Sequence, residues 1–512
     1  MTTLNEEDAA IINSTVNSLY KVITAIPGSH HTLLYLKNAY QDDPFRIALE
    51  LFLVFFAIRY MLSAKYKPHD NAVKLTEKEI DDLVEEWQPE PLVPPLTKFD
   101  RFNLTKTPVI MGAQSVKPKV AGYAKPLMNL ATTNYLNLLA ADTIREKAIS
   151  TLRGYGVGSC GPPGFYGTID VHMDLERDIA EFLGSDAAII YAQGFSTISS
   201  VIPAFCKRGD ILVCDEGVSF AIQKGIQISR SLVRWYKHND MVDLERILTE
   251  IQLEDVLHKK RLTRRFIVSE ALSANFGDIA PLPKLIELKY KYKYRLVLDE
   301  SQSIGVIGSR GAGLTDLFEI PATQVDMIVG SMANALCASG GFCAGSEEIV
   351  DHQRLSGLAY CFSASIPAML AVAASEAIAV IKQHPEQLAE LSQRATSFRQ
   401  ILSHKALAPY IQLFSGDLQN PAPFFHIRIH PDFLQTDTTR QEQEYLLQDV
   451  VDECAYQGVL VTRAHYVEDQ ERHCPSPSIK ISVTIGLTLK ENDKAANIIK
   501  NAILKLFSKW RK

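Results

Sequence analysis

Apolar and polar positions along the chain follow two periodicities, which predict helices alternating with strands. From residue 187 onward, short runs rich in aliphatic and β-branched residues recur between longer helical patterns. The runs are AAIIY (187–191), ILVC (211–214), LVRW (232–235), FIVSE (266–270), RLVLDE (295–300) and VDMIVG (325–330). Several are apolar at every position, which is typical of parallel strands covered by helices on both faces. We therefore expect an α/β fold with a mainly parallel sheet.

The pattern changes at about residue 385. A long amphipathic helix is expected from Pro385 to Lys405, followed by strand-like FFHIRI and IKISVTI and a last helix that ends in KLFSKWRK. This predicts a smaller C-terminal α+β domain over 385–512, after a large domain over 125–384. We expect the basic last turn to be a solvated helix end, with contact to a membrane surface as the alternative.

An apolar stretch lies near the amino terminus. Residues 47–62 read IALELFLVFFAIRYML, with Glu50 and Arg59 as the charges inside the run. A bilayer span needs about 20 apolar residues, and roughly 10 to 14 are more typical of a core helix, so this run falls between the two. Tyrosines and lysines at its end favour a membrane-associated helix over 46–64. A buried or partner-packed helix is the alternative.

The flanks of this stretch are expected to form no large domain of their own. An N-terminal segment over 1–45 precedes it, and a spacer over 65–124 follows. The spacer contains QPEPLVPPL, whose prolines predict a stiff extended connector. Residues 1–15 are polar and acidic, so no secretory signal is expected.

Length, charge and cysteine usage narrow the class of protein. A chain of 512 residues exceeds the roughly 250–300 that one core supports, so several packed units are expected. The net charge of -6 means that the chain has no overall excess of positive charge, so nucleic acid is not an expected partner. The 8 cysteines include no Cys-x-x-Cys pair. We therefore expect reduced thiols facing the cytosol and no structural metal.

Three carboxylates fall where predicted strands end. Asp215, Glu270 and Asp299 each close such a run. Ligands of open α/β sheets bind beyond the carboxyl ends of the strands, so the three together indicate a site. A helix cap or a solvated loop is the alternative for each of them alone.

A glycine-rich segment, RGYGVGSCGPPGFYGT, spans residues 153–168. A dinucleotide fingerprint requires a strand before it and a helix start within it, whereas here a helix is expected before it and two prolines follow inside it. The segment is better interpreted as a close-packed loop at which backbone approaches a ligand or another chain.

Several motifs, taken in order, resemble a known family. They are NYLNL (134–138), the set Gly167, Thr168, His172, Leu175 and Glu176, LDESQSIGVIGSRGAG (298–313) and SGGFCAG (339–345). Over residues 125–510 the chain is similar to the α-oxoamine synthases, fold-type-I pyridoxal-phosphate enzymes that condense an amino acid with an acyl-CoA. The resemblance implies a large domain with a mainly parallel sheet and a smaller C-terminal domain.

The chain departs from that family where the cofactor is held. The resemblance places Asp299 at the carboxylate that pairs with the pyridinium nitrogen. Gln302 stands where members carry a histidine, and Ser219 stands at the position of the ring-stacking histidine. Asn334 occupies the position of the Schiff-base lysine, and an amide cannot form the imine. No lysine lies between Lys293 and Lys382.

These departures resemble the non-catalytic subunits of the family. The chain is therefore expected to have no catalytic residue and no competent cofactor site of its own, with pyridoxal 5'-phosphate held by a homologous catalytic partner in a heterodimer. Small regulatory membrane proteins are expected as further partners, at the endoplasmic reticulum membrane with the large domain in the cytosol. The residues expected to shape the partner's site are Gly158, Cys160, Gly161, Ser331, Asn334, Gly340 and Gly341.

Some alternatives remain open. Cys160 could instead be a small buried hydrophobe. Lys480 falls where family members often carry a carboxylate-binding arginine, and a plain surface lysine is an equal alternative. The chain could also be an autonomous α-oxoamine synthase that uses another lysine. A membrane-tethered scaffold or regulatory protein with an inherited fold is the third possibility.

Overall fold

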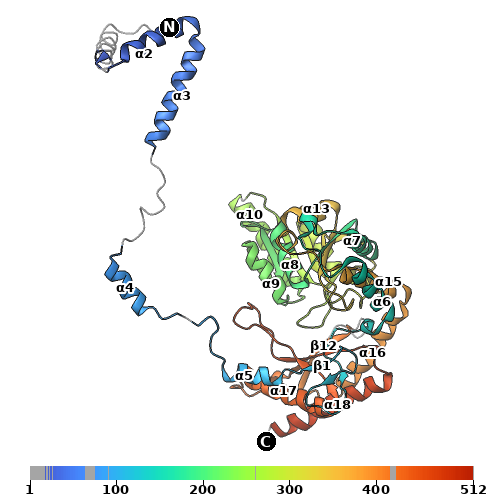
Figure 1. Ribbon diagram of the computed structural model, residues 1–512. Coiled ribbons are helices and arrows are strands. Elements are labelled where there is room, and N and C mark those ends of the chain that lie inside the picture. Colours follow the sequence, from blue (N-terminus) through green and yellow to red (C-terminus); the bar gives the residue numbers. More distant parts are fainter. Residues whose placement is uncertain are drawn as a thin grey trace. The chain divides into compact units, whose positions relative to one another are not determined.

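The computed structural model describes residues 18, 21, 24–25, 27–63, 75–89, 91–259, 261–414 and 422–510. The chain forms two compact units, Met1–Pro95 and Leu96–Lys512 (Figure 1).

The first unit contains helices α2 (Ser29–Asp42), α3 (Pro44–Leu62) and α4 (Glu77–Glu86). The Asp43 carboxylate accepts a hydrogen bond from the Arg46 amide and so caps the start of α3. Most large apolar side chains of α3 are exposed, and of its 19 residues Ile47 alone is buried.

The structure tests the expectation of a membrane-associated helix over 46–64 only in part. A helix does form there, but within the described ranges no helix has both the length and the apolar character needed to cross a membrane. Helix α3 carries three charged residues, Arg46, Glu50 and Arg59, among its 19 residues, and its association with a membrane stays a prediction.

A seven-stranded sheet forms the centre of the second unit. Its strand order is β4-β10-β9-β8-β7-β5-β6. The strands are β4 (Ala187–Tyr191), β5 (Ile211–Asp215), β6 (Leu232–Tyr236), β7 (Arg265–Glu270), β8 (Arg295–Asp299), β9 (Met327–Ser331) and β10 (Gly341–Gly345). Strands β9, β8, β7, β5 and β6 pair in parallel, and β10 runs antiparallel to both of its neighbours. The sheet is therefore mainly parallel, as expected.

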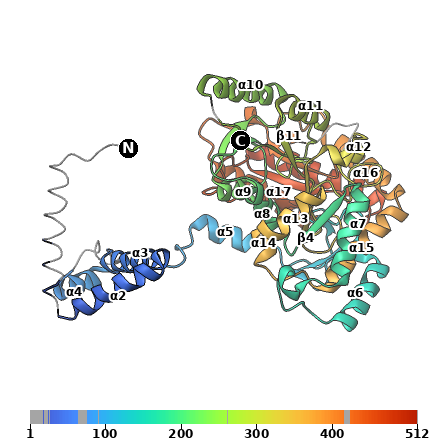
Figure 2. The same ribbon diagram turned by 90° about the horizontal axis from the view of Figure 1, so that it is seen from above.

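Helices cover both faces of this sheet, and alternate residues of each strand point to opposite faces. Ile190, for example, packs with one helical layer, whereas Ile189 packs with the other. The first layer contains α7 (Asp170–Leu183), α10 (Met241–His258), α11 (Leu282–Tyr292) and α15 (Ala368–Gln383). The second contains α8 (Gly194–Phe205), α9 (Phe220–Ser229), α13 (Glu347–Ser356) and α14 (Leu358–Cys361) (Figure 2).

A second sheet, of four strands, lies in the C-terminal part with the order β11-β12-β15-β14. Its strands are β11 (Ile411–Phe414), β12 (Phe424–Ile429), β15 (Ser478–Ser482) and β14 (Thr462–Arg463). Helices α16 (Glu386–Leu402), α17 (Arg440–Tyr456) and α18 (Leu489–Trp510) pack with it around their own apolar core. The remaining elements of this unit are α5 (Lys98–Lys106), α6 (Asp142–Tyr155), α12 (Leu314–Leu317), β1 (Ile110–Met111), β2 (Lys119–Val120), β3 (Met128–Asn129) and β13 (Val459–Leu460).

A segment before the large sheet belongs to this second core. Strand β3 pairs in parallel with β13, and Met128 and Leu130 pack among the C-terminal helices. The chain therefore passes through the smaller core before it enters the larger one. The division at residues 124/125 and 384/385 stays a prediction.

Candidate functional site

A cavity of about 410 Å³ lies at the carboxyl ends of the parallel strands. It is reached by the starts of α8 and α9 and by the ends of β7, β8 and β9. Of the residues predicted from the sequence, the structure brings five together in its lining: Ser219, Asp299, Gln302, Ser331 and Asn334. Glu270, predicted from its place at a strand end, lines the same cavity.

Two buried carboxyl groups lie side by side on the strands beneath the cavity. Glu270 of β7 is the direct register partner of Asp299 of β8, and their exposed fractions are 8% and 5%. Glu270 accepts hydrogen bonds from the amides of Ser219 and Ala274, each at 3.0 Å. Asp299 accepts one from the Ser301 amide at 2.8 Å. Burial raises the pKa of both groups, and the charge of Asp299 raises the pKa of Glu270 further.

Asn334 closes the cavity on the side of β9. Its Nδ2 donates to the backbone carbonyl of Ser301 at 2.7 Å, which ties the loop after β9 to the loop after β8. No lysine is among the described residues that line the cavity. The Oε1 of Gln302 is buried and has no hydrogen-bond partner within the described parts of the chain.

Apolar side chains form another wall. Phe195 at the start of α8 and Phe220 at the start of α9 lie with their ring centroids 5.8 Å apart, and Leu272 lines the cavity as well. Ser219 precedes α9 as its N-cap residue. Sequence reasoning selected Ser219 but missed both phenylalanines. A signal was available, because each phenylalanine lies at the start of the helix that follows a predicted strand.

These residues do not fit pyridoxal phosphate as a Schiff-base cofactor. The carboxyl group of Asp299 is present, but the cavity offers an amide at Asn334 and no amine that could form an imine. The assignment of Asn334 to the family lysine position stays a prediction.

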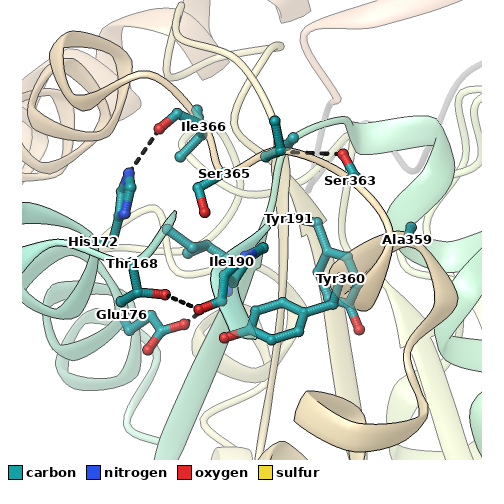
Figure 3. A pocket seen from close by; sticks show the side chains of 13 residues that line it. Thr168, His172, Glu176, Ile190, Tyr191, Ala359, Tyr360, Ser363, Ser365 and Ile366 are labelled. Carbon is teal, nitrogen blue, oxygen red and sulfur yellow. Dashed lines mark hydrogen bonds between the residues drawn. The ribbon is translucent and has the colours of Figure 1, made fainter. Parts of the chain in front are cut away.

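The glycine-rich loop lies against a different cavity. Pro163 and Thr168 line a small space of about 20 Å³ together with residues 359–360 and 363–366 (Figure 3). His172 from α7 contacts the Ile366 carbonyl there at 2.7 Å. A space of this size holds about one water molecule. The arrangement is therefore a packed junction that fixes the loop, and it is not a pocket for an organic ligand.

The three predicted interface positions in this loop are not part of the main cavity. Gly161 is closely packed, because a Cβ atom there would lie 2.7 Å from the Phe165 carbonyl oxygen, whereas Gly158 has open space around it. Cys160 is exposed and has a φ of 56°. The alternative of a small buried hydrophobe at Cys160 is therefore wrong.

Gly340 and Gly341 lie behind the cavity rather than in its lining. Gly340 has a φ of 86°, and its carbonyl accepts a hydrogen bond from the Met332 amide at 3.0 Å. A Cβ atom on Gly341 would collide with the Thr197 side chain of α8. These glycines let β10 pack closely against its neighbours.

Lys480 is not a plain surface lysine. It lies on β15 in register with His426 of β12, and its Nζ is 4.5 Å from the centroid of the Phe424 ring. Burial lowers its pKa to about 8. His426 is buried as well, and burial lowers its pKa to about 3. Lys480 is absent from the lining of the cavity.

Asp215 belongs to a separate polar network that sequence reasoning missed. His238 bridges two carboxylates, with Nδ1 2.7 Å from Asp215 and Nε2 2.9 Å from Asp278. Burial disfavours the charged ring, but the hydrogen bonds to the two carboxylates outweigh it and raise the pKa of His238 to about 10. Phe276 stacks on the ring at 4.2 Å. The signal was present, since His238 also follows the end of a predicted strand.

Comparisons with known proteins agree with this architecture. Residues 125–499 match the family described as aminotransferase class I and II. The serine palmitoyltransferase 1 of Dictyostelium discoideum is 40% identical, over 87% of this chain and 91% of the relative. The serine palmitoyltransferase 1 of Saccharomyces cerevisiae is 36% identical, over 94% of this chain and 93% of the relative.

Solved structures show the same fold. A serine palmitoyltransferase from S. paucimobilis, solved with a PLP–myriocin aldimine, superposes with a TM-score of 0.68 at 20% identity, over 79% of this chain and 97% of that one. The 8-amino-7-oxononanoate synthase of Francisella tularensis gives 0.57 at 22% identity, over 74% of this chain and 98% of that one. The fold is thus that of the fold-type-I pyridoxal-phosphate transferases. The chain belongs to the aminotransferase class I and II family and, within it, to the homologues of serine palmitoyltransferase 1.

Proposed function

We propose that this chain is the lysine-less subunit of a serine palmitoyltransferase. In this proposal a homologous catalytic subunit holds pyridoxal 5'-phosphate, and the two chains together condense L-serine with palmitoyl-CoA to 3-ketodihydrosphingosine, the first step of sphingolipid synthesis. The observation that carries the proposal is a cavity in the position typical of α/β active sites that keeps Asp299 but presents Asn334 and no lysine.

The contribution of this chain is to complete the partner's site. The loop over 156–168 supports this, because it is fixed from behind by the junction with residues 359–360 and 363–366 and exposes apolar side chains. Phe165 is 74% exposed and Tyr166 is 99% exposed. Rigid, outward-facing aromatic side chains are typical of protein interfaces.

The experiment compares three preparations in an assay with L-serine and palmitoyl-CoA: this chain alone, a catalytic homologue alone, and the two co-expressed. We expect turnover in the co-expressed sample only. Turnover by this chain alone would identify an autonomous synthase. Full activity of the homologue alone would identify a scaffold or regulator. Either result overturns the proposal.

A second variant tests the place of the loop. Cys160→Trp adds bulk at an exposed position of the proposed interface, so we expect weaker dimerisation or a changed KM for serine in the co-expressed pair. Leu489→Trp, at an exposed position of α18, is the matched control and leaves both unchanged. Normal dimerisation and serine kinetics in Cys160→Trp would contradict the interface.

We also propose that the protein works at the endoplasmic reticulum membrane with its large domain in the cytosol, alongside small regulatory membrane proteins. The apolar side chains that α3 exposes support a membrane or partner contact, because water-exposed apolar stretches of this length are rare in soluble proteins. Fractionation of cells that express the chain, followed by protease protection, tests the location.

A further inference from the structure

The outward face of α10 carries an apolar cluster that the folding of this chain leaves uncovered. The opposite face of the helix packs on the large sheet through Leu244, Ile247, Leu248 and Ile251. Near its end, Leu253, Val256 and Leu257 recur at the spacing of one helix face and are 63%, 75% and 76% exposed. Leu262, just beyond the helix, is 90% exposed. In both views α10 lies at the periphery of its unit (Figures 1 and 2).

Positive charge adjoins this cluster. Lys259 and Arg261 are exposed, and neither forms an ion pair with another residue in the described part of the chain. Two acidic side chains of the last turns of α10 are engaged with other cations, because Glu254 lies 3.6 Å from Arg234 and Asp255 lies 2.5 Å from Arg265. The surface therefore combines four exposed aliphatic side chains with two cations that have no ion-pair partner among the described residues.

We propose that this surface, the α10 patch of Leu253, Val256, Leu257, Leu262, Lys259 and Arg261, binds an anionic lipid surface. Its aliphatic side chains enter the boundary between headgroups and acyl chains, and its cations contact the lipid phosphates. The composition separates this ligand from a protein partner. The cores of protein interfaces are enriched in aromatic residues and depleted of lysine, whereas the α10 patch contains a lysine and no aromatic residue.

The proposal does not depend on the lysine-less character of the chain or on the α3 helix. It assigns a second lipid contact to the folded Leu96–Lys512 unit, at a helix whose inner face is held by the sheet. Because both halves of the patch are exposed, substitutions there leave the core intact.

Vesicle flotation of the full-length chain tests the proposal, with vesicles of phosphatidylcholine alone and of phosphatidylcholine mixed with phosphatidylserine. We expect more binding to the anionic vesicles, and a loss of that difference at high salt. The double variant Lys259→Glu/Arg261→Glu lowers anionic binding about tenfold or more, since each basic residue near such a surface contributes about fivefold. Leu253→Ser/Leu257→Ser lowers binding to both kinds of vesicle.

Lys490→Glu/Lys494→Glu, at exposed positions of α18, changes the net charge equally and serves as the matched control. It leaves binding as in the unaltered chain. Equal binding by the α10 variants and the control would show that another surface, such as α3, carries the attachment, and would overturn the proposal.

A photo-crosslinking residue in place of Leu257, in membranes that contain the assembled protein, distinguishes the occupants directly. Adducts with lipid are the expected result. Adducts with a protein alone would show that the α10 patch is a protein interface, and would overturn the proposal even if purified vesicles bind.

Discussion

Gly340 shows how tightly the backbone is packed behind the cavity. Its φ of 86° is one that side chains disfavour, and a Cβ atom there would collide with the Tyr191 carbonyl and lie 2.9 Å from Met332 Cε. We expect Gly340→Ala to lower the free energy of unfolding by about 2–4 kcal/mol, measured by urea denaturation. Gly184→Ala shares the backbone strain, with a φ of 77°, but meets nothing within 4 Å, so a loss of about 1 kcal/mol is expected. Equal losses would contradict the packing argument.

At the scale of elements, His238 joins the ends of two neighbouring strands to the loop that carries Asp278. The side chain of Asp215 is 2% exposed, so removal of the ring leaves a buried carboxylate without its cationic partner. We expect His238→Ala to destabilise the protein by about 3 kcal/mol, measured by chemical denaturation. His384→Ala breaks an exposed pair with Glu386 and is expected to cost far less, because solvent screens that pair. Equal losses of stability in His238→Ala and His384→Ala would show that the His238 network contributes little to the stability of the fold.

The elements that sequence reasoning found and missed have a common explanation. Six strands of the large sheet were predicted from their apolar runs, and all but β6 are largely buried along their whole length. Strand β10 was missed because its sequence, GFCAG, consists mostly of small residues. Those residues are set by neighbours that are distant in sequence, such as Thr197 beside Gly341. In the same way, Glu270 and Asp299 were found by the strand-end rule, whereas the partners of Asp215 depend on the strand order, which no local pattern encodes.

For the whole molecule, the resemblance located the cavity more fully than periodicity could. Periodicity gave the carboxylates, and the family motifs added Ser219, Gln302 and Asn334, which the fold brings to the same cavity. The N-terminal helix forms close to its predicted bounds, over Pro44–Leu62 instead of 46–64, and its association with a membrane stays a prediction. The helix begins at Pro44 because the Asp43 side chain caps it, and caps of this kind shift a helix boundary by a residue or two.

The stability of the whole fold is expected to decrease with rising pH through Glu300. This carboxyl group is fully buried, accepts a hydrogen bond from the Leu314 amide at 3.0 Å, and has its pKa raised to about 7 by burial. As the pH rises, the unfolded chain therefore loses the Glu300 proton before the folded chain does. The free energy of unfolding is highest below about pH 4.5 and falls by about 3 kcal/mol as the pH rises to about 7.

Thermal unfolding midpoints measured from pH 5 to 8 test this expectation. Glu300→Gln keeps an oxygen that accepts from the Leu314 amide and has no charge to lose, so it mimics the protonated acid and flattens the decline. Glu319→Gln, at an exposed position, is the control and follows the unaltered chain. Because buried Glu270 and Asp299 titrate in the same direction, part of the slope remains in Glu300→Gln. If the unfolding midpoints of the unaltered chain and of Glu300→Gln changed with pH in parallel, the expectation would be wrong. The Glu300 carboxyl group would then stay ionised inside the fold, and the core would have to relax to bring a positive charge close to it.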